Sequence, residues 1–293
     1  MQRLATLLTA GGLVLAGLTT TPHADGVVVR DGGGDLNAAA ARGTDTYTPP
    51  RIRWRPCRPA DDPDLASVGA QCGRLVVPLD YARPRARKIS LAVSRVRHRS
   101  SAADYQGIML TNPGGPGGPG LWMSLLGSGP IVPGKADNDY DWIGFDPRGV
   151  GQSRPALSCD GSYSHYDRPD YVATTHRLQR LWLRLSRGYA HDCATSAARR
   201  LLRHVRTTDN VADMESLRRA LGRKKINFYG FSYGTYLGQV YATMHPGRVR
   251  RFVLDSNVDP RKVWYRANLG QDVAFDAELH GCSPPAGNWA HAR

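Results

Sequence analysis

The residues best suited to chemistry lie in the stretch from Lys225 to Thr235. Residues 230–234 follow the pattern Gly-x-Ser-x-Gly, with Ser232 at the centre. A β-prone run precedes the pattern and a helical pattern from Tyr236 to His245 follows it, which is the context in which such a serine is a nucleophile. The turn strains the serine backbone, so the residues two before and two after it must be very small. Ser232 is therefore predicted to be a nucleophile at a helix N-terminus, where negative charge is favoured.

A glycine-rich loop is the second chemically suggestive stretch. Residues 107–111 predict a buried strand, Asn112–Gly120 is too rich in glycine and proline to lie inside an element, and a helix is predicted from Leu121 to Leu126. Such a loop can hold phosphate, but the sequence lacks both Gly-Lys-Ser/Thr and Gly-x-Gly-x-x-Gly with a following acid. Bare backbone N–H groups suit a tetrahedral oxyanion better. A purely structural turn is the alternative.

A third stretch, Asp146–Ser153, follows a strand predicted at Asp141–Phe145. Asp146 and Arg148 could act in catalysis. A buried acid–arginine pair beside two glycines mainly fixes a loop, however. We interpret both residues as structural parts of a turn at the strand end.

Strands alternate with helices around these three stretches, which predicts an α/β fold with a mostly parallel sheet and right-handed crossovers. Functional groups then belong at the carboxyl ends of the strands, where both the glycine loop and Ser232 fall. A helix is predicted from Thr208 to Gly222, with Asp209 as a candidate N-cap. A second apolar stripe, at positions 178, 181, 182 and 185, is interpreted as core packing. Further strands are predicted at Gly73–Asp80, Ile89–Val96 and Val249–Leu254.

The charge is strongly positive, with a formal value of +14 that comes almost entirely from arginine. A basic chain can bind nucleic acid. The arginines are scattered, however, and neither aromatic–basic interleaving nor a zinc or helix-turn-helix signature is present. We therefore expect a solvated basic surface and no nucleic-acid partner.

The N-terminus has the pattern of an export signal. Residues 1–24 combine a positive start, an apolar run from Leu4 to Leu18 and a cleavage point near Ala24. The apolar run is too short for a comfortable membrane span, and no other stretch is apolar enough. Residues 25–50 are predicted to be a flexible leader, and residues 51–276 the folded domain. The protein is expected to be secreted, with no stable membrane span.

Five cysteines fit export, because disulfides persist outside the cytosol. The natural sequential pairs are Cys57 with Cys72 and Cys159 with Cys193, among three possible connectivities. Cys282 is left over. No spacing resembles a zinc site, so no metal is predicted.

Taken together, these stretches resemble the α/β-hydrolase serine peptidases of the proline iminopeptidase and secreted bacterial tripeptidyl aminopeptidase type. The resemblance covers roughly residues 50 to 275 and implies that Ser232 is the nucleophile. It also implies an oxyanion hole made by the N–H groups of Tyr233 and Gly115. The expected reaction is acyl transfer from peptides with a free N-terminus, without metal or cofactor. The matching stretches are Cys72–Tyr81, Asn112–Gly120, Asp146–Ser153, Gly230–Thr235 and Leu254–Pro260.

The same family places its catalytic acid and then its histidine after the serine, beyond a lid and two more strands. Only 38 residues follow Asp255 here, so the lid and last strands are expected to be missing. Residues 277–293 lack apolar periodicity and are predicted to be an aberrant, unfolded tail. A strand at 249–254 would then be an exposed, apolar sheet edge, which predicts aggregation or instability.

The acid and base are accordingly unassigned. Asp255 is a weak candidate acid and otherwise a strand-cap residue, while His280 and His291 are weak candidate bases. A serine without its base is a poor nucleophile. The first hypothesis is a secreted aminopeptidase-type serine hydrolase with little activity in this chain. The alternatives are a shortened hydrolase with an improvised base, an esterase, or a secreted non-enzymatic binding or structural protein.

Overall fold

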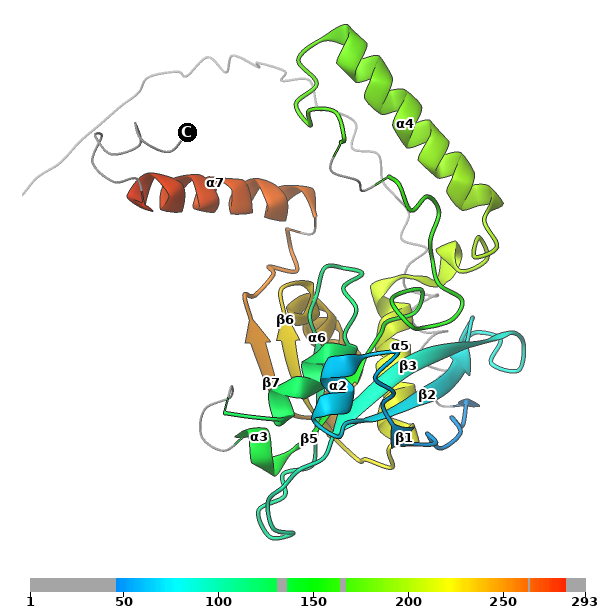
Figure 1. The fold of residues 1–293 in the computed structure, drawn as a ribbon, viewed down its shortest axis with the longest axis vertical. Coiled ribbons are helices and arrows are strands. Elements are labelled where there is room, and N and C mark those ends of the chain that lie inside the picture. The colour runs from blue at the N-terminus through cyan, green and yellow to red at the C-terminus, as the bar shows by residue number, and fades with distance from the viewer. Residues whose placement is uncertain (1–45, 131–135, 164–166, 263, 283–293) are drawn as a thin grey trace, which may run out of the picture.

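The computed structural model describes residues 46–130, 136–163, 167–262 and 264–282. The predicted signal segment and most of the predicted leader lie outside these ranges. Seven strands form one sheet in the order β1-β2-β3-β5-β4-β6-β7 (Figure 1). The strands are β1 Arg55–Pro56, β2 Gln71–Pro78, β3 Lys88–Val96, β4 Ile108–Asn112, β5 Asp141–Phe145, β6 Ile226–Phe231 and β7 Val249–Asp255. The α-helices are α2 Pro63–Ser67, α3 Ala136–Asp139, α4 His176–Thr195, α5 Thr207–Ala220, α6 Tyr233–Met244 and α7 Tyr265–Cys282.

The sheet has two parts. Strands β5, β4, β6 and β7 run parallel, whereas β1, β2 and β3 are joined by antiparallel pairing, and β3 pairs antiparallel with β5. Every residue of β4 and β5 is buried, as expected for central strands covered on both faces. The predicted α/β class with a mostly parallel sheet is thereby confirmed.

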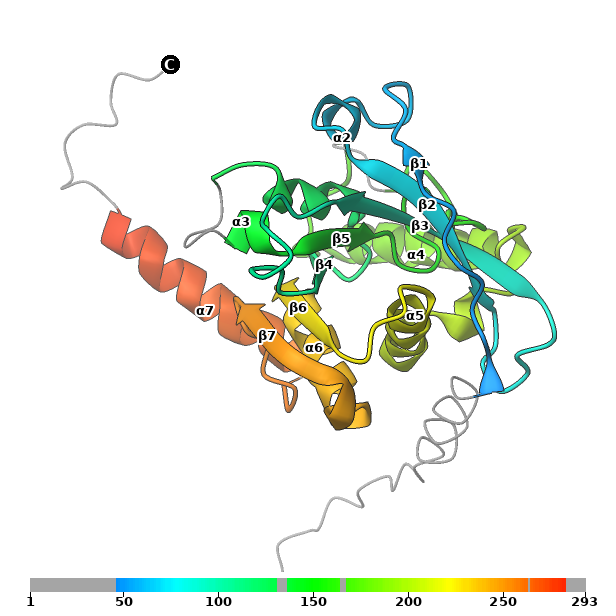
Figure 2. The same cartoon turned by 90° about the horizontal axis from the view of Figure 1, so that it is seen from below.

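Helices α5 and α6 cover one face of the sheet (Figure 2). Their apolar side chains pack in one cluster with Ile108 and Leu110 of β4 and with Ile226 and Phe228 of β6. The 3-10 helix Leu121–Gly127 lies against β3 and β5. This arrangement holds the ends of β4 and β6 rigidly side by side.

Helix α5 begins earlier than its sequence pattern predicts. The N-cap is Arg206, and Asp209 occupies the third helical position, where its Oδ2 accepts a hydrogen bond from the Arg206 N–H at 3.0 Å. Asp209 thus closes the helix start from inside, as an acid at this position does in a capping box. The prediction that Asp209 is the N-cap was therefore wrong, because the N-cap is Arg206, three residues earlier.

The folded domain also begins before residue 51. Tyr47 belongs to the main apolar cluster and is only 9% exposed. Its hydroxyl donates to the Val76 carbonyl at 2.7 Å, and its ring meets Tyr81 edge-on at 6.4 Å. A tyrosine whose ring is buried and whose hydroxyl is satisfied is well suited to anchor a chain end.

Helix α4 corrects a second expectation. None of its residues is buried, and Figure 1 shows it set apart from the sheet. Its apolar stripe meets the preceding loop and not the core: Trp182 stacks with Tyr171 at 5.8 Å and donates its indole N–H to the Asp170 carbonyl at 2.8 Å. The stripe therefore packs locally, which a periodicity argument cannot distinguish from core packing.

Two disulfides hold the ends of irregular segments. Cys57 is bonded to Cys72, which ties the β1 segment to β2. Cys159 is bonded to Cys193, which ties the loop after β5 to the C-terminal part of α4. Both disulfides join cysteines that are consecutive in the sequence, as the sequence analysis predicts.

Strand β7 is the sheet edge within the described residues. Val253 in β7 is 49% exposed and the neighbouring Phe231 is 44% exposed, so the edge is partly apolar. Helix α7 follows and continues over residues 277–282, where the sequence predicted no structure. Its alanine, glutamate and leucine at 277–279 are good helix formers; residues 283–293 lie outside the described ranges.

Candidate active site

Ser232 occupies a sharp turn between β6, which ends at Phe231, and α6, which begins at Tyr233. Its backbone has φ 55° and ψ −123°, a conformation that costs a non-glycine residue energy. Three hydrogen bonds restrain this backbone. The Ser232 N–H donates to the Asp255 carbonyl at 3.0 Å, and the Ser232 carbonyl accepts from the Thr235 N–H at 2.9 Å and from Thr235 Oγ1 at 2.7 Å. The surrounding structure therefore holds the strained serine in place.

The two glycines of the motif are sterically required. A Cβ on Gly230 would lie 2.5 Å from the Gly234 carbonyl oxygen, and a Cβ on Gly234 would lie 2.5 Å from the Asn112 carbonyl oxygen. Both distances are shorter than real Cβ contacts allow. The turn thus needs very small residues at both positions, as its pattern predicts.

The glycine loop lies directly against this turn. Gly114 has φ +92°, and a Cβ there would lie 2.8 Å from the Tyr233 nitrogen and 3.0 Å from Ser232 Cβ. Gly114 donates its N–H to Asn112 Oδ1 at 3.0 Å, so that donor is already used. This close approach places bare backbone beside the serine.

Tyr233 and Gly115 carry the N–H groups predicted to form an oxyanion hole. Neither N–H has a hydrogen-bond partner within the described part of the chain. The Tyr233 N–H belongs to the first turn of α6, where helix N–H groups are unsatisfied and the dipole favours an anion. The assignment of these two donors stays a prediction, and the geometry leaves both free for it.

Asp146 holds the far end of the glycine loop. It is fully buried, and its Oδ1 accepts hydrogen bonds from the N–H groups of Gly120 at 2.8 Å and Leu121 at 3.3 Å. Its Oδ2 accepts from the Gln152 N–H at 2.7 Å. Burial raises the pKa of this carboxyl, and the three N–H donors offset part of that rise. Asp146 therefore fixes the loop and does not touch Ser232.

Arg148 has a different partner from the one the sequence suggested. Its guanidinium forms two hydrogen bonds, at 2.7 and 2.6 Å, with the carboxylate of Asp213 in α5, and not with Asp146. Both side chains are almost completely buried, and Tyr81 donates its hydroxyl to Asp213 at 2.9 Å. Burial alone lowers the pKa of Arg148, but the Asp213 carboxylate outweighs it and raises that pKa. The pair is a structural link between the β5 turn and α5.

A hollow of about 570 Å³ opens beside the glycine loop. Gly114 and Tyr233 line it, so it adjoins one of the two predicted oxyanion donors, the Tyr233 N–H. Asn112 and Asn210 contribute buried amides, and Asn112 Nδ2 and Asn210 Oδ1 have no hydrogen-bond partner among the described residues. The hollow combines polar groups with apolar walls, which is typical of a substrate pocket. Its other lining residues include Pro116, Pro119, Val150, Leu157, Tyr189, Val205 and Leu237.

The described residues do not include an acid and a base that reach the side chain of Ser232. Within the described ranges, no imidazole is hydrogen-bonded to Ser232 Oγ. His280 lies on α7 and is bonded to the Asp276 carbonyl, and His291 is outside those ranges. Asp255 Oδ2 accepts from the Tyr229 hydroxyl at 2.7 Å; burial and this bond raise the pKa of Tyr229 to about 12. Asp255 is thus placed at the strand end, without a histidine partner.

Two negative findings apply to the described residues alone. No group of three or more histidine, cysteine, aspartate or glutamate side chains there is placed to hold a metal ion. In the same part of the chain, no helix combines the length and the apolar character that crossing a bilayer requires.

Fold and site together define a class of protein. The sheet order, the strained serine between β6 and α6, and the glycine loop against it are those of a hydrolase built on an α/β frame. The family model for the alpha/beta hydrolase fold matches residues 107–284. The chain belongs to the α/β-hydrolase fold family.

Curated relatives narrow the similarity further. The chain is 43% identical over 230 residues to the tripeptidyl aminopeptidase of Streptomyces coelicolor, which covers 77% of this chain and 42% of the relative. It is 34% identical over 234 residues to the serine protease Hip1 of Mycobacterium tuberculosis, covering 76% and 43%. It is 35% identical over 291 residues to carboxylesterase B of the same species, covering 94% and 52%. The chain thus spans about half the length of the relatives it matches, or less.

Proposed function

We propose that this protein is a serine hydrolase of the aminopeptidase type that works through an acyl-enzyme on Ser232. The observation that carries the proposal is the strained turn at Ser232, which is packed against Gly114 so that the Tyr233 N–H is free beside the nucleophile. A non-glycine residue is held in such a conformation where function requires it. Nothing else in the turn explains why a serine occupies that position.

In the proposed reaction, Ser232 Oγ attacks the substrate carbonyl carbon and loses its proton to a base. The carbonyl oxygen becomes an oxyanion that accepts hydrogen bonds from the N–H groups of Tyr233 and Gly115. Collapse of the intermediate transfers that proton to the leaving nitrogen, releases the amine and leaves an ester on Ser232. Water then hydrolyses the ester, which releases the carboxylic acid and restores the Ser232 hydroxyl. Because no described imidazole contacts Ser232, the proton transfer is unassisted within the described residues, and we expect low turnover from this chain alone.

The substrate class rests on similarity. Relatives named tripeptidyl aminopeptidase and serine protease favour peptide substrates, and we propose peptides with a free N-terminus. The similarity to a carboxylesterase over 94% of this chain favours ester cleavage as the second candidate. Both reactions use the same nucleophile and oxyanion hole, and an ester needs less proton donation to its leaving group.

We also propose that the protein is secreted. The pattern of residues 1–24 supports export, and two disulfides among the described residues fit an oxidising compartment. Expression of the full chain and of a chain without residues 2–24 in a secreting bacterial host tests this. Equal amounts of both in the culture medium would refute export by this segment.

The decisive experiment for the chemistry is labelling with a fluorophosphonate, which reacts with activated serines. The purified chain is compared with Ser232→Ala and with the matched control Ser256→Ala, since Ser256 also has a positive φ, 59°, and lies on the next strand end. The proposal expects slow labelling that Ser232→Ala abolishes and Ser256→Ala leaves unchanged. Absence of labelling in soluble, folded protein would refute the proposal that Ser232 is an activated nucleophile, and it would favour the non-enzymatic alternative.

A substrate panel then separates the two candidate reactions. Paired peptides with free and acetylated N-termini are compared with a short-chain ester of the same acyl group. Cleavage of the free peptide alone supports the aminopeptidase assignment. Cleavage of the ester without either peptide assigns esterase activity instead.

A further inference from the structure

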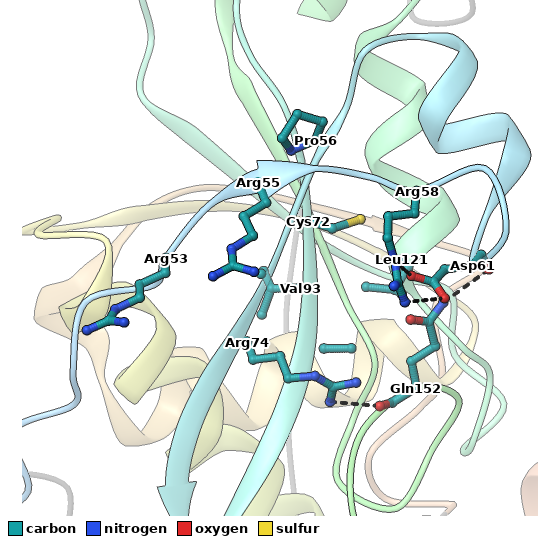
Figure 3. A pocket seen from close by; sticks show the side chains of 12 residues that line it. Arg53, Arg55, Pro56, Arg58, Asp61, Cys72, Arg74, Val93, Leu121 and Gln152 are labelled. Atoms are coloured by element: carbon teal, nitrogen blue, oxygen red, sulfur yellow. Dashed lines mark hydrogen bonds and ion pairs between the residues drawn. The ribbon is translucent and has the colours of Figure 1, made fainter.

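A second hollow, of about 490 Å³, lies over β1 and β2 and is separate from the pocket beside Ser232. Four arginines surround it, and we call it the arginine hollow. Figure 3 shows Arg53, Arg55 and Arg58 extending from the same side of the β1 segment, while Arg74 extends from β2 toward Gln152. One acid, Asp61, lies at its margin.

Strand register explains why the arginines converge. Arg55 pairs with Cys72 across β1 and β2, and Arg53 falls two residues before Arg55, so both extend to the same face. Arg74 is two residues after Cys72 and shares that face. The next strand presents Ala92 opposite Arg74, and such a short side chain leaves a recess between the long ones.

The packing of the segment before β1 keeps this recess in place. A Cβ on Gly73 would lie 2.5 Å from Ile52 Cγ2, so the segment crosses β2 at close range. The Cys57–Cys72 disulfide holds the other end of the same segment. The arginines are therefore mounted on fixed backbone, which limits the entropy lost when they bind a ligand together.

The positive charge of the hollow is only partly neutralised. Arg58 forms two hydrogen bonds with Asp61, at 2.7 and 2.9 Å. Arg74 donates one hydrogen bond to the Gln152 carbonyl at 3.0 Å, which leaves its remaining donors free. The guanidinium groups of Arg53 and Arg55 have no hydrogen bond or ion pair with any described residue. Three guanidinium groups thus surround one recess without a carboxylate partner of their own.

We propose that the arginine hollow binds a ligand carrying phosphate groups. A single carboxylate has two coplanar oxygens and matches the fork of one guanidinium, whereas a phosphate presents oxygens in several directions and accepts from several arginines at once. Arg53, Arg55 and Arg74 approach from two strands, which fits a tetrahedral anion better than a planar one.

The arginine hollow is connected to the glycine loop through hydrogen bonds, but it is not part of the pocket beside that loop. Arg74 donates to the Gln152 carbonyl, and the Gln152 N–H donates to Asp146, which in turn accepts from Gly120 of the glycine loop. The proposal does not depend on the hydrolase activity, because a phosphate ligand would be held whether or not Ser232 is reactive. Binding is therefore measured directly.

The test uses titration calorimetry of the full chain with inorganic tripolyphosphate, and citrate as the carboxylate probe. The variant Arg53→Gln/Arg55→Gln/Arg74→Gln removes the unpaired charges. The control Arg177→Gln/Arg180→Gln/Arg187→Gln removes equal charge from exposed positions on α4. The hollow variant should bind tripolyphosphate at least about tenfold more weakly, since each lost charge-assisted hydrogen bond has that order of effect. The α4 variant should bind like the unchanged protein.

A double variant, Arg53→Gln/Arg55→Gln, guards against a folding effect of Arg74, because neither of these exposed side chains forms a hydrogen bond or an ion pair with a described residue. Equal weakening in the hollow and α4 variants would overturn the proposal in favour of general surface charge, as would citrate binding as tightly as tripolyphosphate. Absence of tripolyphosphate binding overturns a free phosphate ligand. Sedimentation with phosphatidylglycerol vesicles, lost only in the hollow variant, would then assign the phosphate to a lipid headgroup; no sedimentation would overturn the proposal entirely.

Discussion

Replacing Ser232 by glycine is expected to stabilise the fold while removing the nucleophile. The serine has φ 55° and ψ −123°, and such a conformation costs a residue with a Cβ roughly 1–3 kcal/mol. Glycine avoids that cost but loses about 0.5–1 kcal/mol more conformational freedom on folding. The net gain for Ser232→Gly is therefore about 1 kcal/mol in the free energy of unfolding, or roughly 2–4 °C in Tm for a domain of this size.

Alanine at the same position separates backbone strain from loss of the hydroxyl. Ser232 Oγ makes no hydrogen bond within the described residues, so Ser232→Ala should change stability by less than about 0.5 kcal/mol. Ser196→Gly is a control at an unstrained serine, with φ −60° and ψ 156°, and should not stabilise the protein. All three are compared by urea unfolding followed through tryptophan fluorescence.

The reasoning is refuted if Ser232→Gly and Ser232→Ala have equal unfolding free energies. That result would mean that the turn relaxes at no cost and stores no strain. A gain in Ser196→Gly as large as that in Ser232→Gly would likewise show that the effect does not come from the positive φ. Stabilisation confined to Ser232→Gly would show that the nucleophile is kept at the expense of stability.

Three further outcomes are expected. Arg148→Met should lower the unfolding free energy by about 3–5 kcal/mol because it leaves the buried Asp213 carboxylate without its cation. In denaturant titrations, Arg148→Met/Asp213→Leu should recover part of that loss. A double variant whose effect equals the sum of the two single effects would contradict the pairing. Gly114→Ala should abolish fluorophosphonate labelling, because the added Cβ would collide with the Tyr233 nitrogen. Gly117→Ala should only slow the labelling, because Gly117 has a similar φ but open space around it. Equal effects of the two substitutions would count against the close approach of Gly114 to Tyr233. Burial tends to raise the pKa of Asp141, but hydrogen bonds from His98 and Tyr105 outweigh it and lower that pKa, so its stabilising contribution is complete above about pH 4 and lost as the pH falls through the lower folded value. Asp141→Asn should accordingly flatten the acid limb of a stability–pH curve, and an unchanged limb would show that Asp141 is not responsible for it.

The central elements were predictable because their signals are local. A β-prone run, two obligatory glycines and a helical pattern suffice to place Ser232 between β6 and α6, and the same logic places the glycine loop after β4. The strand at Asp141–Phe145 has the bounds that its sequence predicts. Steric demands within a few residues are visible in one sequence, since the residue types allowed there are so few.

The predictions that were wrong concern side chains whose partners the local sequence does not reveal. Arg148 pairs with Asp213, 65 residues further on, and nothing near Arg148 distinguishes that acid from Asp146. One signal existed: Asp213 stands between Val211 and Met214 on a helix that is buried almost throughout, where a charge needs a partner. The stripe on α4 is amphipathic yet packs against its own loop, and periodicity cannot say what an apolar face meets.

The hydrogen bond from the Ser232 N–H to the Asp255 carbonyl joins the proposed nucleophile to β7, the edge strand of the described sheet. Edge strands have one hydrogen-bonded neighbour and open more readily in local unfolding than central ones. When β7 frays, the strained turn loses one of its three backbone hydrogen bonds and its amide becomes exchangeable with solvent. We therefore expect the opening of β7 to loosen the turn at Ser232, and a molecule that pairs with this edge to keep the turn in place for longer.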